Sequence, residues 1–155
     1  MKLTTKGRYA IIAMADLVLH SRTNPVSLKD ITKRQRISLS YLEQLFSKLR
    51  ESNVVQSIRG PGGGYILGRD SSEISLLDII TAVDEKIDQT QCGGAMNCNK
   101  DKPCLTHYIW TELNEKISQY MSDITLSDIA TREDVNNIMI FRENENVSNH
   151  QRQKK

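Results

Sequence analysis

The sequence predicts a mainly α-helical fold with one small β-hairpin, and two patterns carry this prediction. Apolar residues recur at helical spacing in several segments of the 155-residue chain, which is typical of amphipathic helices. Residues 60–64 form a run of glycines and one proline between two short β-rich segments, and such a run favours a tight turn. A chain of this length buries about one modest core, so we expect one domain with an appended element.

Three helices are predicted in the N-terminal part of the chain, over residues 9–20, 27–34 and 39–51. Each follows a hydroxyl side chain that can accept a hydrogen bond from the first helical turn. These candidate caps are Thr4 or Thr5, Ser27, and Ser38 or Ser40. In the third helix four apolar residues share one face, which leaves the intervening polar side chains nearer to solvent.

A hairpin is predicted directly after the third helix, with β-rich segments at residues 54–58 and 65–67. The Gly60-Pro61-Gly62-Gly63-Gly64 turn between them needs φ values that only glycine adopts without strain. A phosphate-binding P-loop is excluded, because no helix with a Lys and a Ser or Thr follows the glycines. The order of three helices and a hairpin is that of a winged helix-turn-helix, although a plain flexible loop remains the alternative for the glycine run.

The second half of the chain predicts two further helices and an irregular segment. Ser75 and Asp78 can cap an amphipathic helix that runs to Val83, and periodicity then disappears until Pro103. Pro103 suits the first turn of a long helix over residues 104–122. This helix carries an apolar stripe longer than a small domain needs, so we expect a dimerisation helix covered by a partner subunit. The stripe comprises Ile109, Leu113, Ile117, Tyr120 and Met121.

The tail and the charge distribution complete the outline. From Phe141 onward polar and charged residues dominate, so the C-terminal segment, residues 131–155, is predicted to be variable and disordered. Residues 1–70 carry 12 Lys and Arg against 5 Asp and Glu, whereas residues 71–155 carry 9 against 14. The positive half is where an acidic polymer such as DNA is expected to bind. No apolar run is long enough to cross a bilayer and no leader pattern is present, so we expect a cytoplasmic protein without a membrane partner.

The third helix and the wing supply the residues expected to contact double-stranded DNA. In a helix-turn-helix, the N-terminal residues of the second helix meet base edges in the major groove, where Gln, Glu and Ser can all form base contacts. An arginine in the wing suits the negative potential of a minor groove, and Lys or Arg near the ends of the helices suit phosphates. The alternative for Ser40 and Glu43 is a capping box without a DNA role. The expected residues are Ser38, Ser40, Tyr41, Glu43, Gln44, Arg59, Gly60, Lys6, Lys48 and Arg50.

Four residues that can ligate a metal lie within sixteen positions: Cys92, Cys98, Cys104 and His107, which include every cysteine of the chain. Three cysteines cannot form a closed set of disulfides, so thiolate ligation is the leading interpretation. The x₅ spacings are looser than most structural zinc knuckles and suit a larger object such as an iron-sulfur cluster. Zinc, and redox or catalytic thiols activated by His107, remain open on spacing alone.

Four segments carry a family resemblance: residues 1–10, 37–46, 59–65 and 104–107. Together they closely resemble the bacterial iron-sulfur cluster regulators, and the similarity covers roughly residues 1–130. The resemblance implies a homodimeric winged helix-turn-helix transcription factor that represses or activates cluster-biogenesis genes at operator sites. It also implies one [2Fe-2S] cluster per subunit, held by Cys92, Cys98, Cys104 and His107 and supplied by cluster-assembly proteins.

The chain is expected to divide into a DNA-binding region, a cluster-binding and dimerisation region, and the tail. Residues 1–70 are expected to form the winged helix-turn-helix region, and residues 71–130 the cluster-binding loop and dimerisation helices. Within this fold the alternatives are a zinc-stabilised repressor and a repressor that responds to thiol oxidation or nitric oxide. A cluster carrier or metal-binding enzyme is disfavoured, because the sequence has neither a carboxylate pair beside the cysteines nor a nucleotide-binding motif.

Overall fold

The computed structural model describes the backbone of residues 3–152 and the side chains of residues 3–145. The described part is mostly helical with one two-stranded antiparallel sheet, as the sequence predicts. Its elements are α1 (Thr5–His20), α2 (Leu28–Gln35), α3 (Leu39–Glu51), β1 (Val55–Ile58), β2 (Gly64–Leu67), the 3-10 turn η1 (Ser71–Glu73), α4 (Leu76–Ala82), α5 (His107–Asp123), α6 (Leu126–Thr131) and α7 (Glu133–Arg152). No helix within residues 3–152 has the length and apolar character that a membrane crossing requires.

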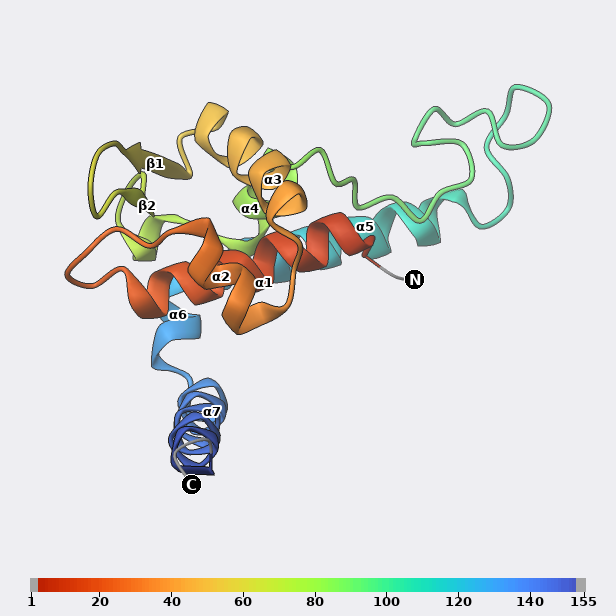
Figure 1. Cartoon of the computed structure of the whole chain (residues 1–155). Helices are drawn as coiled ribbons and strands as arrows, with labels where there is room; N and C mark the ends of the chain where they lie inside the picture. The colour runs from red at the N-terminus through yellow and green to blue at the C-terminus, as the bar shows by residue number, and fades with distance from the viewer. Residues whose placement is uncertain (1–2, 153–155) are drawn as a thin grey trace.

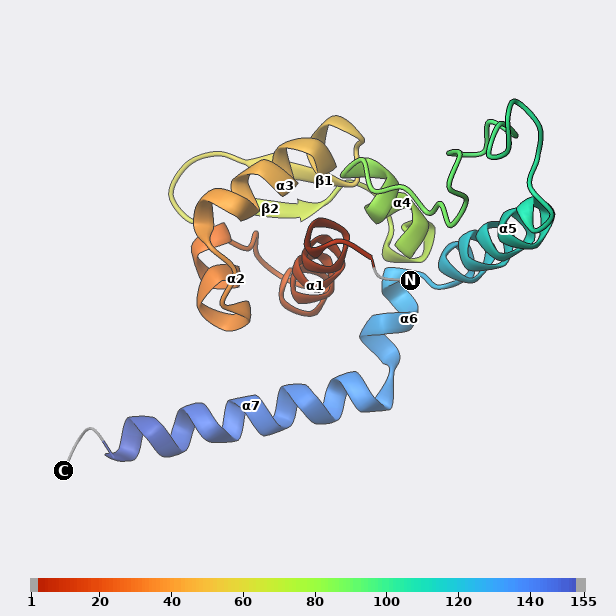
Figure 2. The same ribbon diagram turned by 90° about the vertical axis from the view of Figure 1, so that its right-hand side faces the viewer.

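Helix α1 lies at the centre of the fold. It contacts α2, α3 and β2 as well as α4 and α6, and Figure 2 shows it enclosed by these elements. Ala10 and Ala13 are fully buried, and their small side chains let neighbouring helices approach from more than one side. Leu17, Leu42 and Phe46 are also fully buried and form part of one continuous apolar core. The core therefore unites the three N-terminal helices with the helices that follow the hairpin.

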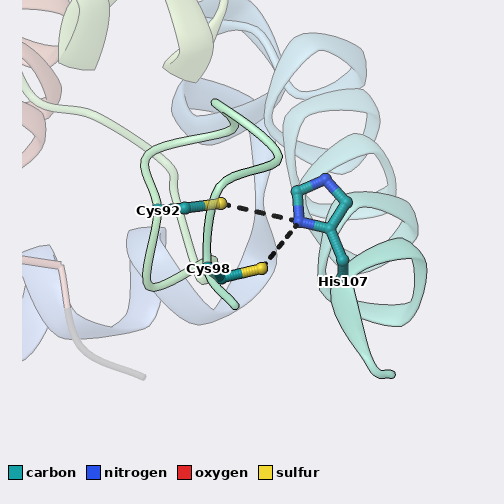
Figure 3. Close-up of side chains that lie close together, drawn as sticks. All are labelled: Cys92, Cys98 and His107. Carbon is teal, nitrogen blue, oxygen red and sulfur yellow. Dashed lines mark hydrogen bonds between the residues drawn. The ribbon is translucent and has the colours of Figure 1, made fainter. Parts of the chain in front are cut away.

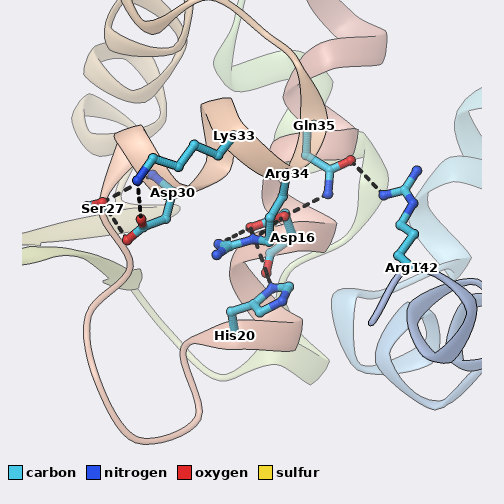
Figure 4. A network of polar contacts seen from close by, with 8 residues as sticks. All are labelled: Asp16, His20, Ser27, Asp30, Lys33, Arg34, Gln35 and Arg142. Atoms are coloured by element: carbon cyan, nitrogen blue, oxygen red, sulfur yellow. Dashed lines mark hydrogen bonds and ion pairs between the residues drawn. The ribbon is translucent and has the colours of Figure 1, made fainter. Parts of the chain in front are cut away.

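A buried carboxylate joins α1 to α2. The side chain of Asp16 is fully buried, and both of its oxygens accept hydrogen bonds from Arg34, the shortest being 2.7 Å (Figure 4). Gln35 Nε2 donates to Asp16 Oδ2 at 2.7 Å, and His20 Nδ1 lies 3.5 Å from Asp16 Oδ1. A buried charge needs such a set of partners, because an unpaired carboxylate in the core is strongly unfavourable. This network fixes α2 on α1.

Helix starts follow the predicted caps in most cases. Ser27, Ser38 and Ser75 each accept a hydrogen bond from the backbone N–H three residues later. Ser75 and Asp78 form a full capping box, which confirms the prediction for this helix. Thr4 precedes α1 but its side chain makes no capping bond; its hydroxyl is instead hydrogen-bonded to the Glu85 carboxylate. Each side-chain cap is worth about 1 kcal/mol of helix stability.

The hairpin is held in a fixed place relative to the helices. Val55 pairs with Leu67 and Ile58 with Gly64, and Gly60 and Gly62 have φ of 101° and 72°, so the predicted glycine turn is confirmed. At Gly64 an added Cβ would lie 2.4 Å from the carbonyl oxygen of Val26, because strand β2 passes close to the α1–α2 connection. An isolated bridge between Val26 and Tyr65 joins the two segments there.

Helix α5 is joined to the body of the fold near its C-terminal end. Leu76 N–H donates to the Ile124 carbonyl and Leu126 N–H to the Ile74 carbonyl, both at 2.9 Å. From this junction α5 extends outward, and the irregular segment before it loops beyond its N-terminal end (Figure 1). The helix begins at His107 instead of the predicted Cys104, because Thr106 has a non-helical φ of −110° and ψ of 7°.

The C-terminal segment differs from the prediction of a disordered tail. The structure has a helix, α7, over Glu133–Arg152, while residues 153–155 lie outside the described part. Two features favour this helix: Glu133 and Asp134 stand in its first turn, where acidic residues are stabilising, and no Gly or Pro interrupts it. Arg142 of α7 donates to Gln35 of α2 at 3.2 Å. Polar composition alone thus failed to predict the local helical preference of this segment.

Candidate metal centre and nucleic-acid interface

The segment between α4 and α5 is shaped by a turn that its own side chains build. Asp88 Oδ1 accepts hydrogen bonds from the N–H and the hydroxyl of Thr90, at 2.7 and 2.6 Å. Asn114 of α5 donates to the same Asp88 oxygen and accepts from the N–H of Gln89. The Thr90 hydroxyl in turn accepts from the N–H of Gly94 at 2.8 Å. This Asx-type turn attaches the loop to α5 just before the first cysteine.

Cys92, Cys98 and His107 converge on one point beside the start of α5. The two thiols come from the loop and the imidazole from the first turn of the helix, as Figure 3 shows. Nδ1 of His107 lies 3.5 Å from Sγ of Cys92 and 3.7 Å from Sγ of Cys98. Each residue offers one ligand atom, and the three atoms all lie within 4.8 Å of one another. His107 is only 4% exposed, so the group of three ligand residues is partly shielded from solvent.

Cys104 lies next to this group without being part of it. Its backbone N–H donates to Sγ of Cys98 at 3.0 Å, whereas its own sulfur lies 3.7 Å from the hydroxyl of Thr106. Cys104 precedes the helix, which begins at His107, so the two residues do not share a helix face. The structure brings together three of the four predicted ligands and leaves the fourth adjacent to them.

The thiols differ in how readily they ionise. Burial opposes ionisation of Cys92, but hydrogen bonds from the backbone of Met96 and from Thr90 outweigh it and lower the pKa of Cys92 to about 6. For Cys98 the Cys104 backbone N–H acts to lower the pKa, but burial and the neighbouring thiols outweigh it and the pKa is raised. The Cys104 pKa is lowered by its hydrogen bonds with Cys98 and Thr106. Ionisation is therefore favoured at Cys92 and Cys104 and disfavoured at Cys98.

The donor set fits a soft metal centre. Thiolate sulfur and imidazole nitrogen are ligands of zinc and of iron-sulfur clusters, whereas magnesium and calcium prefer oxygen. A hollow of about 470 Å³ adjoins the group between the loop and α5, with His107 and Gly93 in its lining. Of the three converging residues, only His107 lines this hollow. A separate hollow of about 540 Å³ lies between α2 and α7, lined by His20, Arg34 and Arg142 among others.

The residues predicted to read DNA lie on or beside the exposed face of α3. Ser40, Glu43 and Gln44 are exposed, and Ser38 caps the helix by accepting a hydrogen bond from the N–H of Tyr41 at 3.4 Å. The interpretation of Ser40 and Glu43 as a capping box is therefore wrong, since Ser38 holds the capping position. Tyr41 is half-buried, and its ring packs edge-on against that of Tyr9 with centroids 5.8 Å apart.

The basic residues predicted to contact DNA fall into two groups: exposed arginines and lysines that already contact other residues of the chain. Arg59 and Gly60 are exposed at the wing, and Arg50 is exposed at the end of α3. Lys48 is ion-paired with the Asp84 carboxylate, and Lys6 Nζ donates to the Asp84 carbonyl oxygen at 3.1 Å. Both lysines thus contact Asp84, the first residue of the irregular segment that carries Cys92 and Cys98.

Sequence reasoning did not identify the two acidic residues at this junction. Asp84 directly follows the C-cap of α4, and the hydrogen bond and charge of Lys48 lower its pKa. Glu85 accepts a hydrogen bond from the N–H of Thr4 at 3.0 Å, and the site of a Cβ on Gly7 lies 3.0 Å from Glu85 Cγ. Thr4 and Glu85 are 81 residues apart in the chain, so no local spacing indicates the contact.

A family model described as "Iron-dependent Transcriptional regulator", Rrf2, matches residues 3–132. The chain belongs to the Rrf2 family. It is 55% identical over 135 residues to the HTH-type transcriptional regulator IscR of Serratia proteamaculans, a match that covers 87% of this chain and 82% of that protein. The IscR of Yersinia pestis is 53% identical over the same length and the same shares of both chains.

Solved Rrf2-type structures have the same fold. The chain aligns with T. potens IscR at a TM-score of 0.69 and 37% identity, which covers 83% of this chain and 85% of that one. It aligns with CymR, the global cysteine regulator of B. subtilis, at a TM-score of 0.73 and 33% identity, covering 84% and 97%. The chain is therefore a winged-helix transcriptional regulator of the IscR type and not an enzyme.

Proposed function

We propose that this Rrf2 protein senses iron-sulfur cluster status through a [2Fe-2S] cluster and thereby represses or activates cluster-biogenesis genes. The observation that carries the proposal is the convergence of Cys92, Cys98 and His107, with all three ligand atoms within 4.8 Å. The same chain also contains a helix-turn-helix whose second helix, α3, exposes polar side chains such as Ser40, Glu43 and Gln44. Such a regulator acts where the chromosomal DNA is, in the cytoplasm, and receives its cluster from cluster-assembly proteins.

We place the cluster on Cys92, Cys98, Cys104 and His107, one cluster per subunit. When bound, it supplies a redox-active centre that can be lost or damaged, which makes occupancy a signal. The low pKa of Cys92 provides one thiolate near neutral pH, and the Asx turn at Asp88 holds the loop against α5. Cys104 adjoins Cys98 through its own backbone N–H, so a modest loop movement suffices to add its sulfur to the group.

We assign base reading to the first turns of α3 and groove contact to the wing. Gln44 can bond adenine in bidentate fashion, Ser40 can bond either kind of base edge, and Glu43 can accept from the cytosine amino group. Arg59 suits a narrow minor groove. Two such reading helices in a homodimer address the two halves of an operator site.

We assign the dimer interface to the outer face of α5. Tyr108, Ile109 and Tyr120 are 67%, 61% and 64% exposed in the single chain, an unusual exposure for large apolar side chains on one helix. A second copy that packs along this face covers them. The interface then lies next to both His107 residues, so occupancy of the centre and dimer geometry are physically adjacent.

The cluster assignment is tested by anaerobic reconstitution with iron and sulfide, followed by visible absorption and by iron, sulfide and zinc analysis. Wild type is expected to become reddish with two irons and two sulfides per chain, whereas Cys92→Ala, Cys98→Ala and Cys104→Ala should lose the colour. His107→Cys should retain a cluster that is lost more slowly, because thiolate replaces a neutral ligand. Met96→Ala is the matched control, since it removes a neutral sulfur from the same loop.

Two outcomes would overturn the cluster assignment. A colourless wild type with one zinc per chain would mean a zinc-stabilised regulator, and a fully loaded Cys98→Ala variant would mean that the ligands lie elsewhere. DNA reading is tested separately by anisotropy titrations of operator and random duplexes. Gln44→Ala should weaken operator binding by about 1 to 3 kcal/mol and spare random DNA; equal losses on both duplexes would show that Gln44 contacts only the backbone.

A further inference from the structure

Two lysines from opposite ends of the DNA-binding region meet at one acidic residue. Lys6 lies in the first turn of α1 and Lys48 in the last turn of α3, and both contact Asp84. Lys48 is ion-paired with its carboxylate, and Lys6 Nζ donates to its backbone carbonyl at 3.1 Å. The adjacent Glu85 carboxylate carries a second negative charge at the same place. Asp84 and Glu85, the two residues after the C-cap of α4, therefore surround these lysines with negative charge, as DNA phosphates would; we call this place the junction.

The backbone fixes the position of Asp84. Helix α4 ends with Val83 as its C-cap, and Asp84 follows in the left-handed conformation with φ of 56°. Asp84 N–H donates to the Thr81 carbonyl at 3.0 Å and Glu85 N–H to the Ile80 carbonyl at 2.9 Å. These two bonds are the Schellman motif that ends many helices. The backbone of Asp84 is consequently held by the end of α4, while its side chain stays 70% exposed and reaches Lys48.

We propose that Asp84 is an intramolecular competitor for DNA phosphate, which holds Lys48 and Lys6 away from the nucleic acid until this junction opens. The proposal rests on the assignment of the two lysines to phosphate contact. Asp84 also begins the segment that carries Cys92 and Cys98. Movement of the C-terminal end of α4 away from α3 releases both lysines together. Because the segment with the two cysteines starts at this end, the movement links the candidate metal centre to overall DNA affinity in addition to base reading.

The competition has a measurable electrostatic consequence. Each lysine that neutralises a phosphate releases counterions, so the slope of log K against log salt changes by roughly 0.9 for every additional phosphate that is neutralised. Removal of the Asp84 carboxylate frees Lys48 directly and removes the charge attraction of that carboxylate for Lys6, whose hydrogen bond to the backbone carbonyl remains. One to two more phosphates should therefore be bound by lysine, with tighter binding to any duplex. Sequence preference should not change, because phosphate contacts carry no base information.

The experiment measures anisotropy of a fluorescent random-sequence duplex titrated with full-length protein at several salt concentrations. Asp84→Asn should bind more tightly than wild type, several-fold at low salt, with a slope steeper by about one to two. Asp84→Gly is the second variant, since Gly and Asn both adopt the left-handed conformation that α4 requires. Glu73→Gln removes the same charge from an exposed residue distant in sequence and controls for net charge.

A double-mutant cycle with Lys48→Gln decides the mechanism. If Lys48 is the released residue, Asp84→Asn strengthens binding much less in a Lys48→Gln background. Equal affinities of Asp84→Asn and Glu73→Gln, or an Asp84→Asn effect that persists undiminished without Lys48, would overturn the proposal. Failure of the underlying DNA assignment looks different: Asp84→Asn and Lys48→Gln would then each leave binding to random DNA unchanged, and Gln44→Ala would also leave operator affinity unchanged.

Discussion

Replacement of Asp16 by alanine should destabilise the fold by about 3 kcal/mol. The Asp16 side chain is fully buried and accepts hydrogen bonds from Arg34 and Gln35. Loss of one partner of a buried ion pair costs about 3 to 5 kcal/mol, because the other charge is left without compensation. Arg34 keeps 33% of its side chain exposed and can partly rehydrate, so the lower end of this range applies. Asp16→Asn should lose nearly as much, since the amide has no charge.

Urea unfolding at one fixed protein concentration measures this cost. With a slope of about 2 kcal/mol per molar urea, the midpoint should fall by roughly 1.5 M. Lys33→Ala is the control, because Lys33 neighbours Arg34 and its side chain is 79% exposed; its effect should stay within about 0.5 kcal/mol. If the Asp16→Ala midpoint matched that of Lys33→Ala, the network would contribute nothing to stability and α2 would be held on α1 by apolar packing alone.

Three further perturbations have defined outcomes. Gly64→Ala places a methyl group against a backbone carbonyl that cannot move freely, so urea midpoints should show a loss of about 1 to 3 kcal/mol and DNA titrations a weakened wing contact. Glu43→Ala should leave the melting temperature nearly unchanged, because Ser38 caps α3. The metal-free Glu43→Ala protein should bind more tightly than metal-free wild type to operators that wild type rejects without its metal centre. A lower melting temperature with unaltered operator preference would contradict this. Ile109→Asp should weaken the dimer roughly ten-fold or more in sedimentation equilibrium, whereas Lys116→Gln on the same helix should leave the mass unchanged.

Local patterns in the sequence predicted most of the fold. Capping residues such as Ser27 and Ser75 act within three positions, and the turn glycines act through their own φ values, so both are readable without tertiary information. The end of the long helix was also close, at Asp123 instead of residue 122. Its start was misplaced because Thr106, at the N-cap position, has non-helical φ and ψ angles.

The remaining features depend on residues that are distant in sequence. Lys48 and Asp84 are 36 positions apart, and Thr4 and Glu85 are 81 apart, so spacing rules cannot relate them. The sequence placed Lys48 among free phosphate contacts for this reason. The sequence spacing identified all four candidate ligands. It could not show that Cys92, Cys98 and His107 form a group from which Cys104 is left out, because this depends on how the loop folds.

The attachment of α5 near one end gives it the mechanics of a lever. Its junction with the body lies at Leu76–Ile124 and Ile74–Leu126, while the candidate metal centre lies at the opposite end, 17 helical residues away. At 1.5 Å per residue this arm is about 25 Å long, so a tilt of roughly 5° at one end displaces the other by about 2 Å. The lever works in both directions. Helix α5 contacts α4, and α4 and α6 both pack against α1, so a tilt of α5 caused by repacking at Cys92, Cys98 and His107 has a contiguous path to the central helix of the fold.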